Sequence, residues 1–315
     1  MSKKYNILVT GCGGDIGQSI GKILKSHSMF NLVVGCDMND QHAGKFIFDK
    51  CMKVPPCSSD QYRPVLEDIL KEFNISLILP TSEPELRFDA ENSIYGYFSD
   101  IQLISANLKA KEIGFDKQLT ANFLKAEGLP FPLTQIASDI KEPHLPLIMK
   151  DRKGSGSKLL FLVKDRIEFD FYSKKFPDFI AQEFIDNSEE EYTCGLFRDL
   201  KENVRTISYR RKLIGDSSGF GTVVHNDRID QLLLTIAKKL DLRGAINVQL
   251  RLSKNNTPIV FEINPRFSST VLFRHLMGFE DVIWSIQDRL GIEISAYNPP
   301  QKGRNFYKGF NEYVD

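Results

Sequence analysis

The sequence lacks most of the features that would place a protein in a membrane or around a structural metal. No apolar run approaches the roughly 20 residues that a helix needs to cross a bilayer. The chain begins with a strand and without the apolar core of a signal peptide, so we expect a cytoplasmic protein. The five cysteines form no Cys-x-x-Cys pair and the five histidines no His-Glu-x-x-His motif. We therefore expect reduced thiols and no structural zinc.

The sequence also lacks any excess of charge of one sign. Lysine plus arginine and aspartate plus glutamate number 41 each, so the formal net charge is 0. A neutral chain has no general attraction for nucleic acid or for an anionic membrane, and we expect neither as a partner. Any phosphate must then be bound by local basic clusters. At 315 residues, the chain is long enough for two or three packed units.

Residues 245–266 have the pattern of a hairpin, with two strand-like runs on either side of a polar turn from Ser253 to Pro258. If Leu252 faces Ile259, antiparallel pairing places opposite each other two further pairs, Gln249 with Glu262 and Asn247 with Asn264. One face of this hairpin is then apolar: Ile246, Val248, Leu250, Leu252, Ile259, Phe261 and Ile263. The other face is nearly all polar: Asn247, Gln249, Arg251, Glu262, Asn264 and Arg266.

The polar face of this hairpin suits a hard divalent cation. It would bring one carboxylate and two amide oxygens, from Glu262, Gln249 and Asn264, within reach of one ion. Oxygen ligands of this kind suit Mg²⁺ that is held jointly with phosphate groups. The same alternation would also arise in an ordinary half-buried hairpin with one solvent-exposed side, and spacing alone does not separate the two.

The string Glu262-Ile-Asn-Pro-Arg266, preceded by Gln249, resembles the metal-binding signature of the ATP-grasp superfamily, especially the carbamoyl-phosphate-synthase-like ligases. The resemblance implies that Gln249, Glu262 and Asn264 hold Mg²⁺, with Mn²⁺ as an alternative, on the phosphates of ATP. It also implies a catalytic role for Asn264, and for Arg266 a contact with the transferred phosphoryl group or the substrate.

The first hundred residues begin as a β-α-β unit. A strand from Tyr5 to Thr10 leads into a glycine turn at residues 11–17, a helix to about Lys25, and a strand from Leu32 to Cys36 that ends in Asp37. Such a turn suits an anion at a helix N-terminus. It fits a short-chain dehydrogenase that binds NAD, but no tyrosine has the lysine four residues on that this family uses. It also resembles the Rossmann-like domain that precedes ATP-grasp units.

A second half of this unit follows, with a helix from about Gln61 to Phe73 and a strand from Ser76 to Leu79. The polar residues after that strand lie where open α/β sheets bind ligands. The family resemblance implies a substrate near this edge, which makes candidates of Thr81, Ser82 and Glu83. A solvated loop that caps the next helix is the alternative. A strand from Ile101 to Ser105 would complete the domain.

The pattern of residues 109–127 predicts a helix. The resemblance implies that Lys117, within this stretch, reaches the ATP phosphates. Strands at 147–150 and 159–163 enclose a basic, glycine-rich loop that is not a Walker A loop, because it lacks that motif and precedes a strand. The loop could close over a triphosphate or be only a flexible basic hairpin tip. The resemblance favours a phosphate flap with the residues Lys150, Gly154, Ser155, Gly156 and Ser157.

Two strands, at 179–185 and 191–197, enclose an acidic bend. The resemblance makes this bend the hinge between the lobes that hold ATP. Adenine would then meet the backbone of the segment Glu183-Phe184-Ile185, because fixed donors and acceptors read a base edge well. The ribose would meet Glu191, although Glu189 and Glu190 remain alternatives.

The last part of the chain carries a basic strand at 204–213, for which the resemblance implies that Arg211 faces the substrate. The alternative for these consecutive basic residues is a solvent-exposed strand at the edge of a sheet. The resemblance implies a mobile loop at 214–222. Helices are expected at 229–240, at 267–277 with Ser268 and Ser269 near the start, and at 281–290. A short, proline-rich and basic tail follows.

Together these features predict an α/β and α+β protein. It would have a Rossmann-like domain at 1–107, followed by a two-lobed ATP-grasp fold with a small lobe at 108–187 and a catalytic lobe at 188–315. By resemblance, the activity would be an ATP-dependent carboxylate–amine ligase working through an acyl phosphate, with an amino acid or sugar derivative as the amine. A nucleotide-binding module without turnover and the dehydrogenase are the alternatives. A homodimer is left open.

Overall fold

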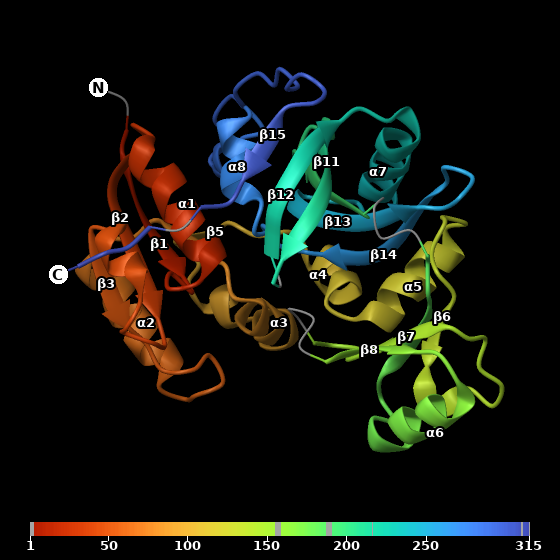
Figure 1. The fold of residues 1–315 in the computed structure, drawn as a ribbon. Helices are drawn as coiled ribbons and strands as arrows, with labels where there is room; N and C mark the ends of the chain where they lie inside the picture. Colours follow the sequence, from red (N-terminus) through yellow and green to blue (C-terminus); the bar gives the residue numbers. More distant parts are fainter. Residues whose placement is uncertain (1–2, 155–158, 187–190, 216, 310, 315) are drawn as a thin grey trace.

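The protein, described here from a computed structural model, contains three β-sheets that follow one another along the chain (Figure 1). The structure describes residues 3–154, 159–186, 191–215, 217–309 and 311–314. The first sheet is parallel and the other two are antiparallel. This arrangement confirms the predicted fold class, an α/β unit followed by two α+β units.

The N-terminal sheet has the strand order β3-β2-β1-β4-β5. Its strands are β1 (Tyr5–Thr10), β2 (Phe30–Asp37), β3 (Lys50–Lys53), β4 (Leu77–Pro80) and β5 (Gln102–Leu103), and its helices are α1 (Asp15–Ser26), α2 (Tyr62–Glu72) and α3 (Glu83–Asn92). The strand order reverses between β1 and β4, and ligands of open α/β sheets bind at such a point. The glycine turn after β1 is tight, because a Cβ on Gly17 would lie 2.3 Å from the carbonyl oxygen of Gly11.

The small lobe is built on the sheet β6-β9-β7-β8. Its elements are α4 (Leu108–Gly114), α5 (Lys117–Ala126), β6 (Thr134–Ile136), β7 (Leu147–Lys150), β8 (Leu160–Val163), α6 (Arg166–Lys175) and β9 (Ile180–Glu183). The prediction of one helix over 109–127 was wrong. The chain breaks at Phe115 and Asp116, because the Asp116 side chain accepts hydrogen bonds from the backbone N–H groups of Gln118 and Leu119 and so starts a new helix.

The catalytic lobe is built on the sheet β14-β13-β10-β11-β12-β15. Its elements are β10 (Glu191–Arg198), β11 (Val204–Ile214), β12 (Ser217–Val224), α7 (Asp227–Lys239), β13 (Gly244–Leu252), β14 (Pro258–Asn264), α8 (Val271–Leu276), α9 (Asp281–Arg289) and β15 (Asn305–Tyr307). Two predictions were wrong here. Most of the segment expected to be a loop at 214–222 is strand β12, and α8 begins at Val271 with Ser268 and Ser269 in the loop before it.

The hairpin of β13 and β14 has the predicted register only at the end that carries the polar residues. Gln249 pairs with Glu262 and Asn247 with Asn264, but Leu252 pairs with Pro258 and not with Ile259. A β-bulge between these pairs shifts the register by one residue, which exchanges the two faces of the strand beyond it.

The bulge changes which side chains of β14 face the core. Val260 packs in the buried cluster with Val248 and Leu250, whereas Ile259 and Phe261 are only partly buried. The placement of Ile259 and Phe261 on the apolar face was therefore wrong. Phe261 lines a cleft on the other side of the sheet.

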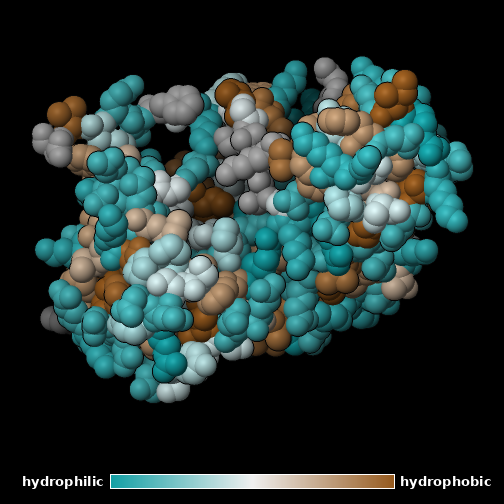
Figure 2. Space-filling model, turned by 90° about the horizontal axis from the view of Figure 1, so that it is seen from below, coloured by the Kyte–Doolittle hydropathy of each residue, from teal (hydrophilic) through white to brown (hydrophobic). Residues whose placement is uncertain are grey.

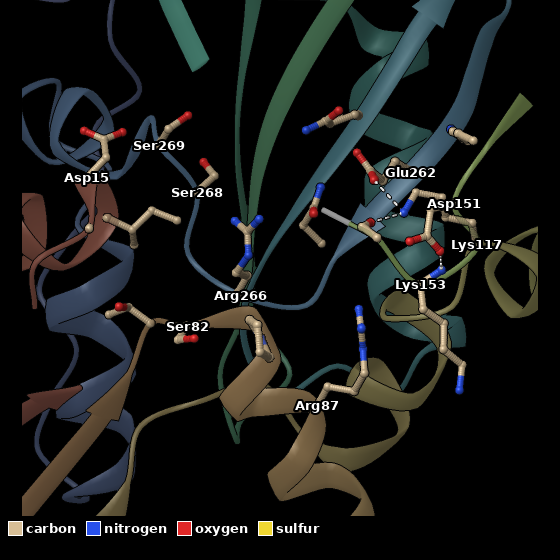
Figure 3. Close-up of a pocket in the computed structure, with 18 of the residues that line it drawn as sticks. Asp15, Ser82, Arg87, Lys117, Asp151, Lys153, Glu262, Arg266, Ser268 and Ser269 are labelled. Atoms are coloured by element: carbon tan, nitrogen blue, oxygen red, sulfur yellow. Dashed lines mark hydrogen bonds and ion pairs between the residues drawn. The ribbon is translucent and has the colours of Figure 1, made fainter. Parts of the chain in front are cut away.

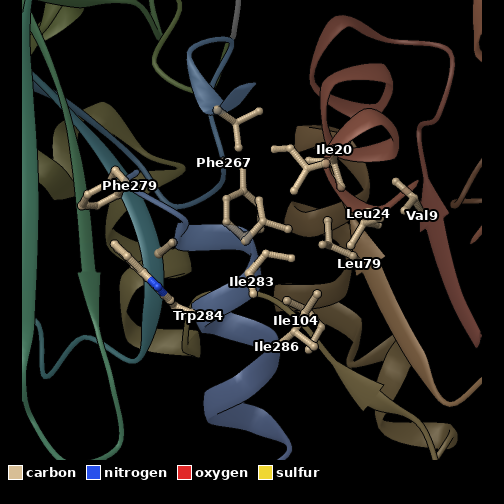
Figure 4. Packing of buried hydrophobic residues seen from close by; sticks show 14 of the residues in the cluster. Val9, Ile20, Leu24, Leu79, Ile104, Phe267, Phe279, Ile283, Trp284 and Ile286 are labelled. Carbon is tan, nitrogen blue, oxygen red and sulfur yellow. The ribbon is translucent and has the colours of Figure 1, made fainter. Parts of the chain in front are cut away.

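A single buried cluster joins the N-terminal sheet to the catalytic lobe. Figure 4 shows Phe267, Ile283 and Ile286 of the catalytic lobe facing Ile20 and Leu24 of the N-terminal domain, and all five belong to one cluster. Close packing of this kind resists relative movement. We therefore expect the N-terminal domain and the lobe packed on it to keep a fixed relative position.

Beyond this core, the face of the molecule seen in Figure 2 is mostly hydrophilic, with hydrophobic residues in small separate groups. None of the described helices is long and apolar enough to cross a membrane. All five cysteines are free thiols, as the sequence predicted.

Candidate active site

A cleft of about 1290 Å³ lies where the three sheets meet. The predicted nucleotide, metal and catalytic residues in the described part of the chain all line it: Lys117, Lys150, Gly154, Glu183, Phe184, Ile185, Glu191, Arg211, Gln249, Glu262, Asn264 and Arg266. Glu83, a candidate for the substrate edge, does not line it. Ser155, Gly156 and Ser157 of the phosphate loop, and the alternatives Glu189 and Glu190, lie outside the described residues. The cleft continues to the carboxyl edge of the parallel sheet, where Thr81 and Ser82 line it.

Lys117 and Glu262 face each other across the cleft, with Lys117 Nζ 3.6 Å from Glu262 Oε1 (Figure 3). The helix break described above makes Lys117 the first residue of α5. A glycine brings this region close to β14, because a Cβ on Gly114 would lie 2.7 Å from Pro265 Cδ. Lys117 Nζ also donates to the carbonyl oxygen of Gly154, at 2.5 Å, and so links the helix to the glycine-rich loop.

Lys150, at the end of β7, is a buried cation. Burial lowers the pKa of its ammonium group from 10.5 to about 8. Its charged form is partly supported by Glu262 and by the ring of Phe261, whose centroid lies 5.6 Å from Lys150 Nζ. A buried lysine that keeps its charge near neutral pH is a strong binding group for a polyanion.

Glu262 remains ionised in the same surroundings. Burial on its own would raise the pKa of its carboxyl, but the neighbouring cations, above all Lys117 and Lys150, outweigh burial and place that pKa below its ordinary value. Asn264 also hydrogen-bonds to Glu262 and favours the charged form. In this part of the cleft the Glu262 carboxylate thus lies among several cations.

Gln249, Glu262 and Asn264 share the polar side of the hairpin, as their pairing in the register requires. They offer one carboxylate and two amide oxygens. No group of three or more histidine, cysteine, aspartate or glutamate side chains that could bind a metal occurs among the described residues. A set with so few charged ligands fits an ion that shares its coordination with phosphates and water, as Mg²⁺ does.

Glu191, the predicted ribose residue, is held between two arginines. Its Oε1 accepts from Arg211 Nη2 at 2.8 Å, and its Oε2 accepts from Arg251 Nη2 at 2.7 Å. These guanidinium groups outweigh burial and keep the pKa of Glu191 below its ordinary value. Arg211 also donates to Gln249 Oε1, at 3.0 Å. Strand alternation turns Arg211 into the cleft and leaves Arg210 and Lys212 exposed.

The hinge backbone expected to meet adenine also lines the cleft. The Glu183 N–H donates to the carbonyl oxygen of Leu133, and the Glu183 carboxylate accepts from the Leu133 N–H. The carbonyl oxygen of Ile185 accepts from Arg251 Nη1 at 3.0 Å. Arg251 therefore ties the hinge to Glu191.

Arg266 lies at the centre of the cleft, between the polar hairpin and the N-terminal domain (Figure 3). Its Nε and Nη2 both donate to Glu83 Oε2, at 3.2 and 3.1 Å, and its Nη1 donates to the carbonyl oxygen of Phe267. The predicted substrate edge of the parallel sheet is thus in direct contact with the residue that ends the signature string.

The cleft contains several residues that sequence reasoning missed as site residues: Arg87, Arg251, Phe261, Ser268 and Ser269. Arg251 was on the predicted polar face and could have been chosen from its alternation. Phe261 could not, because the bulge that turns it toward the cleft leaves no mark in the alternation of the sequence.

A model of an ATP-grasp domain matches residues 115–270, the segment that carries Lys117 and Lys150, the predicted hinge and the polar hairpin. The chain belongs to the ATP-grasp superfamily. A carbamoyl-phosphate synthase of Methanobrevibacter smithii is 31% identical over 96 residues, which is 29% of this chain and 26% of that protein. The match thus spans only about a quarter of the curated relative.

Solved structures resemble this ATP-grasp protein over nearly its whole length. An L-amino acid ligase from Bacillus licheniformis has a TM-score of 0.70 at 18% identity, with 92% of this chain and 75% of that one covered. An N5-carboxyaminoimidazole ribonucleotide synthetase in complex with ADP has a TM-score of 0.76 at 13% identity, with 95% and 80% covered. At these identities the likeness shows the fold.

The biotin carboxylase domain of the 2-oxoglutarate carboxylase from Hydrogenobacter thermophilus has a TM-score of 0.74 at 16% identity, with 95% of this chain and 72% of that one covered, and it was solved with MgADP, ADP and bicarbonate. ATP-grasp proteins therefore bind magnesium nucleotides on this fold. The glycine turn of the N-terminal sheet belongs to that fold, and the dehydrogenase alternative is set aside.

Proposed function

We propose that this ATP-grasp protein is a carboxylate–amine ligase that uses ATP and releases ADP and phosphate. The observation that carries the proposal is the continuity of one cleft. Lysine, carboxylate and amide side chains line it, and so do arginine and hydroxyl groups that continue to the edge of the parallel sheet. A phosphoryl group bound in the middle would point toward a substrate at that edge. We keep the division into 1–107, 108–187 and 188–315 as part of this proposal.

In this proposal Lys117 and Lys150 hold the phosphates of ATP, together with the glycine-rich loop that begins at Gly154. Their proximity to Glu262 supports the assignment, because two cations beside one carboxylate leave a net positive charge that suits phosphate, and the carboxylate suits a metal ion. Adenine lies against the hinge at 183–185. The ribose meets Glu191, which requires one of the bound arginines to release an oxygen of that carboxylate.

Gln249, Glu262 and Asn264 would hold Mg²⁺, and Mn²⁺ offers the same preference for oxygen ligands. When bound, the ion would neutralise charge on the phosphates during transfer. The hydrogen bond between Asn264 and Glu262 would orient the carboxylate toward it. Arg211 and Arg266 supply further positive charge on the phosphoryl side of the cleft, where charge develops as the bond to ADP breaks.

The reaction then takes two steps. An oxygen of the substrate carboxylate attacks the γ-phosphorus, and the bond from that phosphorus to the bridging oxygen breaks, which releases ADP and leaves an acyl phosphate. The lone pair of an amine attacks the acyl carbon, phosphate leaves with its bonding electrons, and the nitrogen loses a proton. Phosphate is a far better leaving group than oxide or hydroxide. Catalysis of this kind needs positioning and charge but no side-chain nucleophile.

The names of the structural relatives frame the choice of substrates. One is an L-amino acid ligase, which supports an amino acid as the amine, and others are carboxylases or a ribonucleotide synthetase, which keeps a sugar derivative open. Purified protein would be screened for ADP release against pairs of carboxylates and amines, and each product would be identified by mass. Tight binding of MgATP with no ADP release from any pair would instead support a nucleotide-binding module.

Glu262→Gln is the sharpest variant for the same assay. It keeps the size of the side chain but removes the negative charge among the cations, so we expect turnover to fall by about 100-fold or more. Glu91→Gln, which removes an exposed carboxylate from the C-terminal end of α3, is the matched control. ADP release by Glu262→Gln at the rate of Glu91→Gln would refute the metal assignment.

A further inference from the structure

The carboxylate of Glu83 lies between two arginines that both line the cleft. Arg266 donates to its Oε2 through Nε and Nη2, and Arg87, one turn further along α3, donates to its Oε1 from Nη2 at 3.1 Å. Glu83 itself does not line the cleft, whereas both arginines do. The Glu83 carboxylate is therefore hydrogen-bonded to two guanidinium groups that a ligand in the cleft could also contact.

Arg87 has donor capacity that the fold does not use. Its Nε is buried and has no hydrogen-bond partner among the described residues. Its guanidinium carbon lies 5.6 Å from the centroid of the Phe115 ring. Leaving a buried donor unpaired is costly, so the position favours an acceptor from outside the chain.

The charges at this place also leave room for an anion. Two arginines and one glutamate give a local charge of plus one, and a monocarboxylate would bring it to zero. A planar carboxylate matches the fork of a guanidinium group better than a single-point anion does. Glu83 shows this match within the chain, because each of its oxygens already accepts from a different arginine.

From this geometry we infer that Arg87 and Arg266 form the subsite for the carboxylate of the substrate, and that Glu83 is an internal competitor that occupies these arginines until the substrate arrives. The inference rests on the proposed ligase function and adds Arg87 to its binding residues. Glu83 is a positioning residue: it holds Arg266 against the N-terminal domain. The substrate carboxylate would take over part of these hydrogen bonds from Glu83.

Acetate and inorganic phosphate are the probes that test this subsite. Their affinities for the protein saturated with MgADP would be measured by ligand-observed NMR titration. In Glu83→Gln the competing charge is gone, so the apparent acetate affinity should rise at least about fivefold. In Arg87→Met it should fall below that of the wild type. The matched control Glu91→Gln, on the same helix, should leave it unchanged.

A gain of affinity cannot come from a damaged fold, which keeps the test decisive. If Glu83→Gln does not fold, Glu83→Asp, which shortens the reach to both arginines, should raise acetate affinity in the same direction. Unchanged acetate affinity in the Glu83 variant, or equal affinity in Arg87→Met and wild type, would overturn the subsite. So would a phosphate affinity that exceeds that of acetate and rises more strongly in Glu83→Gln.

The outcome is separable from that of the ligase proposal. Acetate binding that follows Glu83 and Arg87, with no ADP release from any substrate pair, would keep the subsite and refute the ligase. Turnover of a substrate pair together with acetate binding that ignores Glu83 and Arg87 would do the reverse.

Discussion

Individual residues in this protein acquire their roles from burial next to opposite charge. Lys150 is the clearest case, since burial brings the pKa of an ordinary lysine down to about 8 while Glu262 supports its charge. Glu262 shows the converse, because cations hold the pKa of a buried carboxyl low. Both groups are therefore charged at neutral pH. Glu262 stabilises the charge of Lys150, and Lys117 and Lys150 stabilise the charge of Glu262.

The pKa of Lys150 predicts how nucleotide affinity depends on pH. In the protein without ATP the ammonium group loses its proton as the pH rises through about 8, and phosphate binding prefers the protonated form. The affinity for MgATP should therefore fall above pH 8. Loss of the charged contact should cost roughly 1.5–3 kcal/mol of binding free energy. Lys150→Arg keeps its charge and should flatten this dependence. The affinities would be measured by calorimetric titration from about pH 6.5 to about 9.5. An affinity for MgATP that falls equally in both proteins would count against the assignment.

The proposed ribose contact of Glu191 predicts a preference among nucleotides. Wild-type protein should bind ATP more tightly than 3′-deoxyATP, because the missing hydroxyl leaves the carboxylate without that partner. Glu191→Gln should weaken both nucleotides and make their affinities nearly equal. A preference that survives in Glu191→Gln would mean that Glu191 serves only to hold Arg211 and Arg251.

At the scale of elements, the strands and helices with strong local signals were predictable and the interruptions were not. The strands at Tyr5–Thr10 and Leu147–Lys150 were predicted to the residue, because each is a short apolar run between turn signals. The register of the hairpin of β13 and β14 was predicted correctly at Gln249 and Glu262. Local pattern is enough for such elements.

Three features were predicted wrongly, each for a different physical reason. The bulge at Phe261 does not alter the alternation of apolar and polar residues in the sequence. It becomes evident only from the strand pairing and from the packing of Val260 in the core. Strand β12 is rich in glycine and serine and is stabilised by pairing with β11, a long-range contact. The break before Lys117 did leave a signal, since Asp116 is a good N-cap residue, but helical propensity on both sides concealed it.

The N-cap of α5 predicts a link between stability and ATP binding. Asp116 accepts from two backbone N–H groups and pairs with Arg152 Nη2 at 2.7 Å. Asp116→Ala should lower the free energy of unfolding by about 1–2 kcal/mol and raise the KM for ATP, because Lys117 follows the cap directly. Asp116→Asn retains the cap and should behave closer to wild type in denaturant unfolding. An Asp116→Ala protein with wild-type stability and KM would show that the cap does not position Lys117.

At the scale of the whole molecule, the site depends on the way that distant parts of the chain are joined. The shared cluster around Phe267 and Ile283 fixes the catalytic lobe on the N-terminal sheet, and the contact of Arg266 with Glu83 spans the same boundary. Sequence patterns predicted each part but not this joint, because it is made of contacts between residues far apart in the chain, 183 positions in the case of Arg266 and Glu83. Because of this joint, the edge of the parallel sheet and the polar hairpin line one cleft.

The central claim is that the γ-phosphoryl group passes to a substrate carboxylate in this cleft. It is tested most directly with the first substrate pair that turns over, its carboxylate labelled with oxygen-18. An acyl phosphate formed on the carboxylate oxygen leaves that oxygen with the phosphate. The account predicts one labelled oxygen per phosphate released, found by mass spectrometry. Phosphate that carries no label while product forms would contradict it.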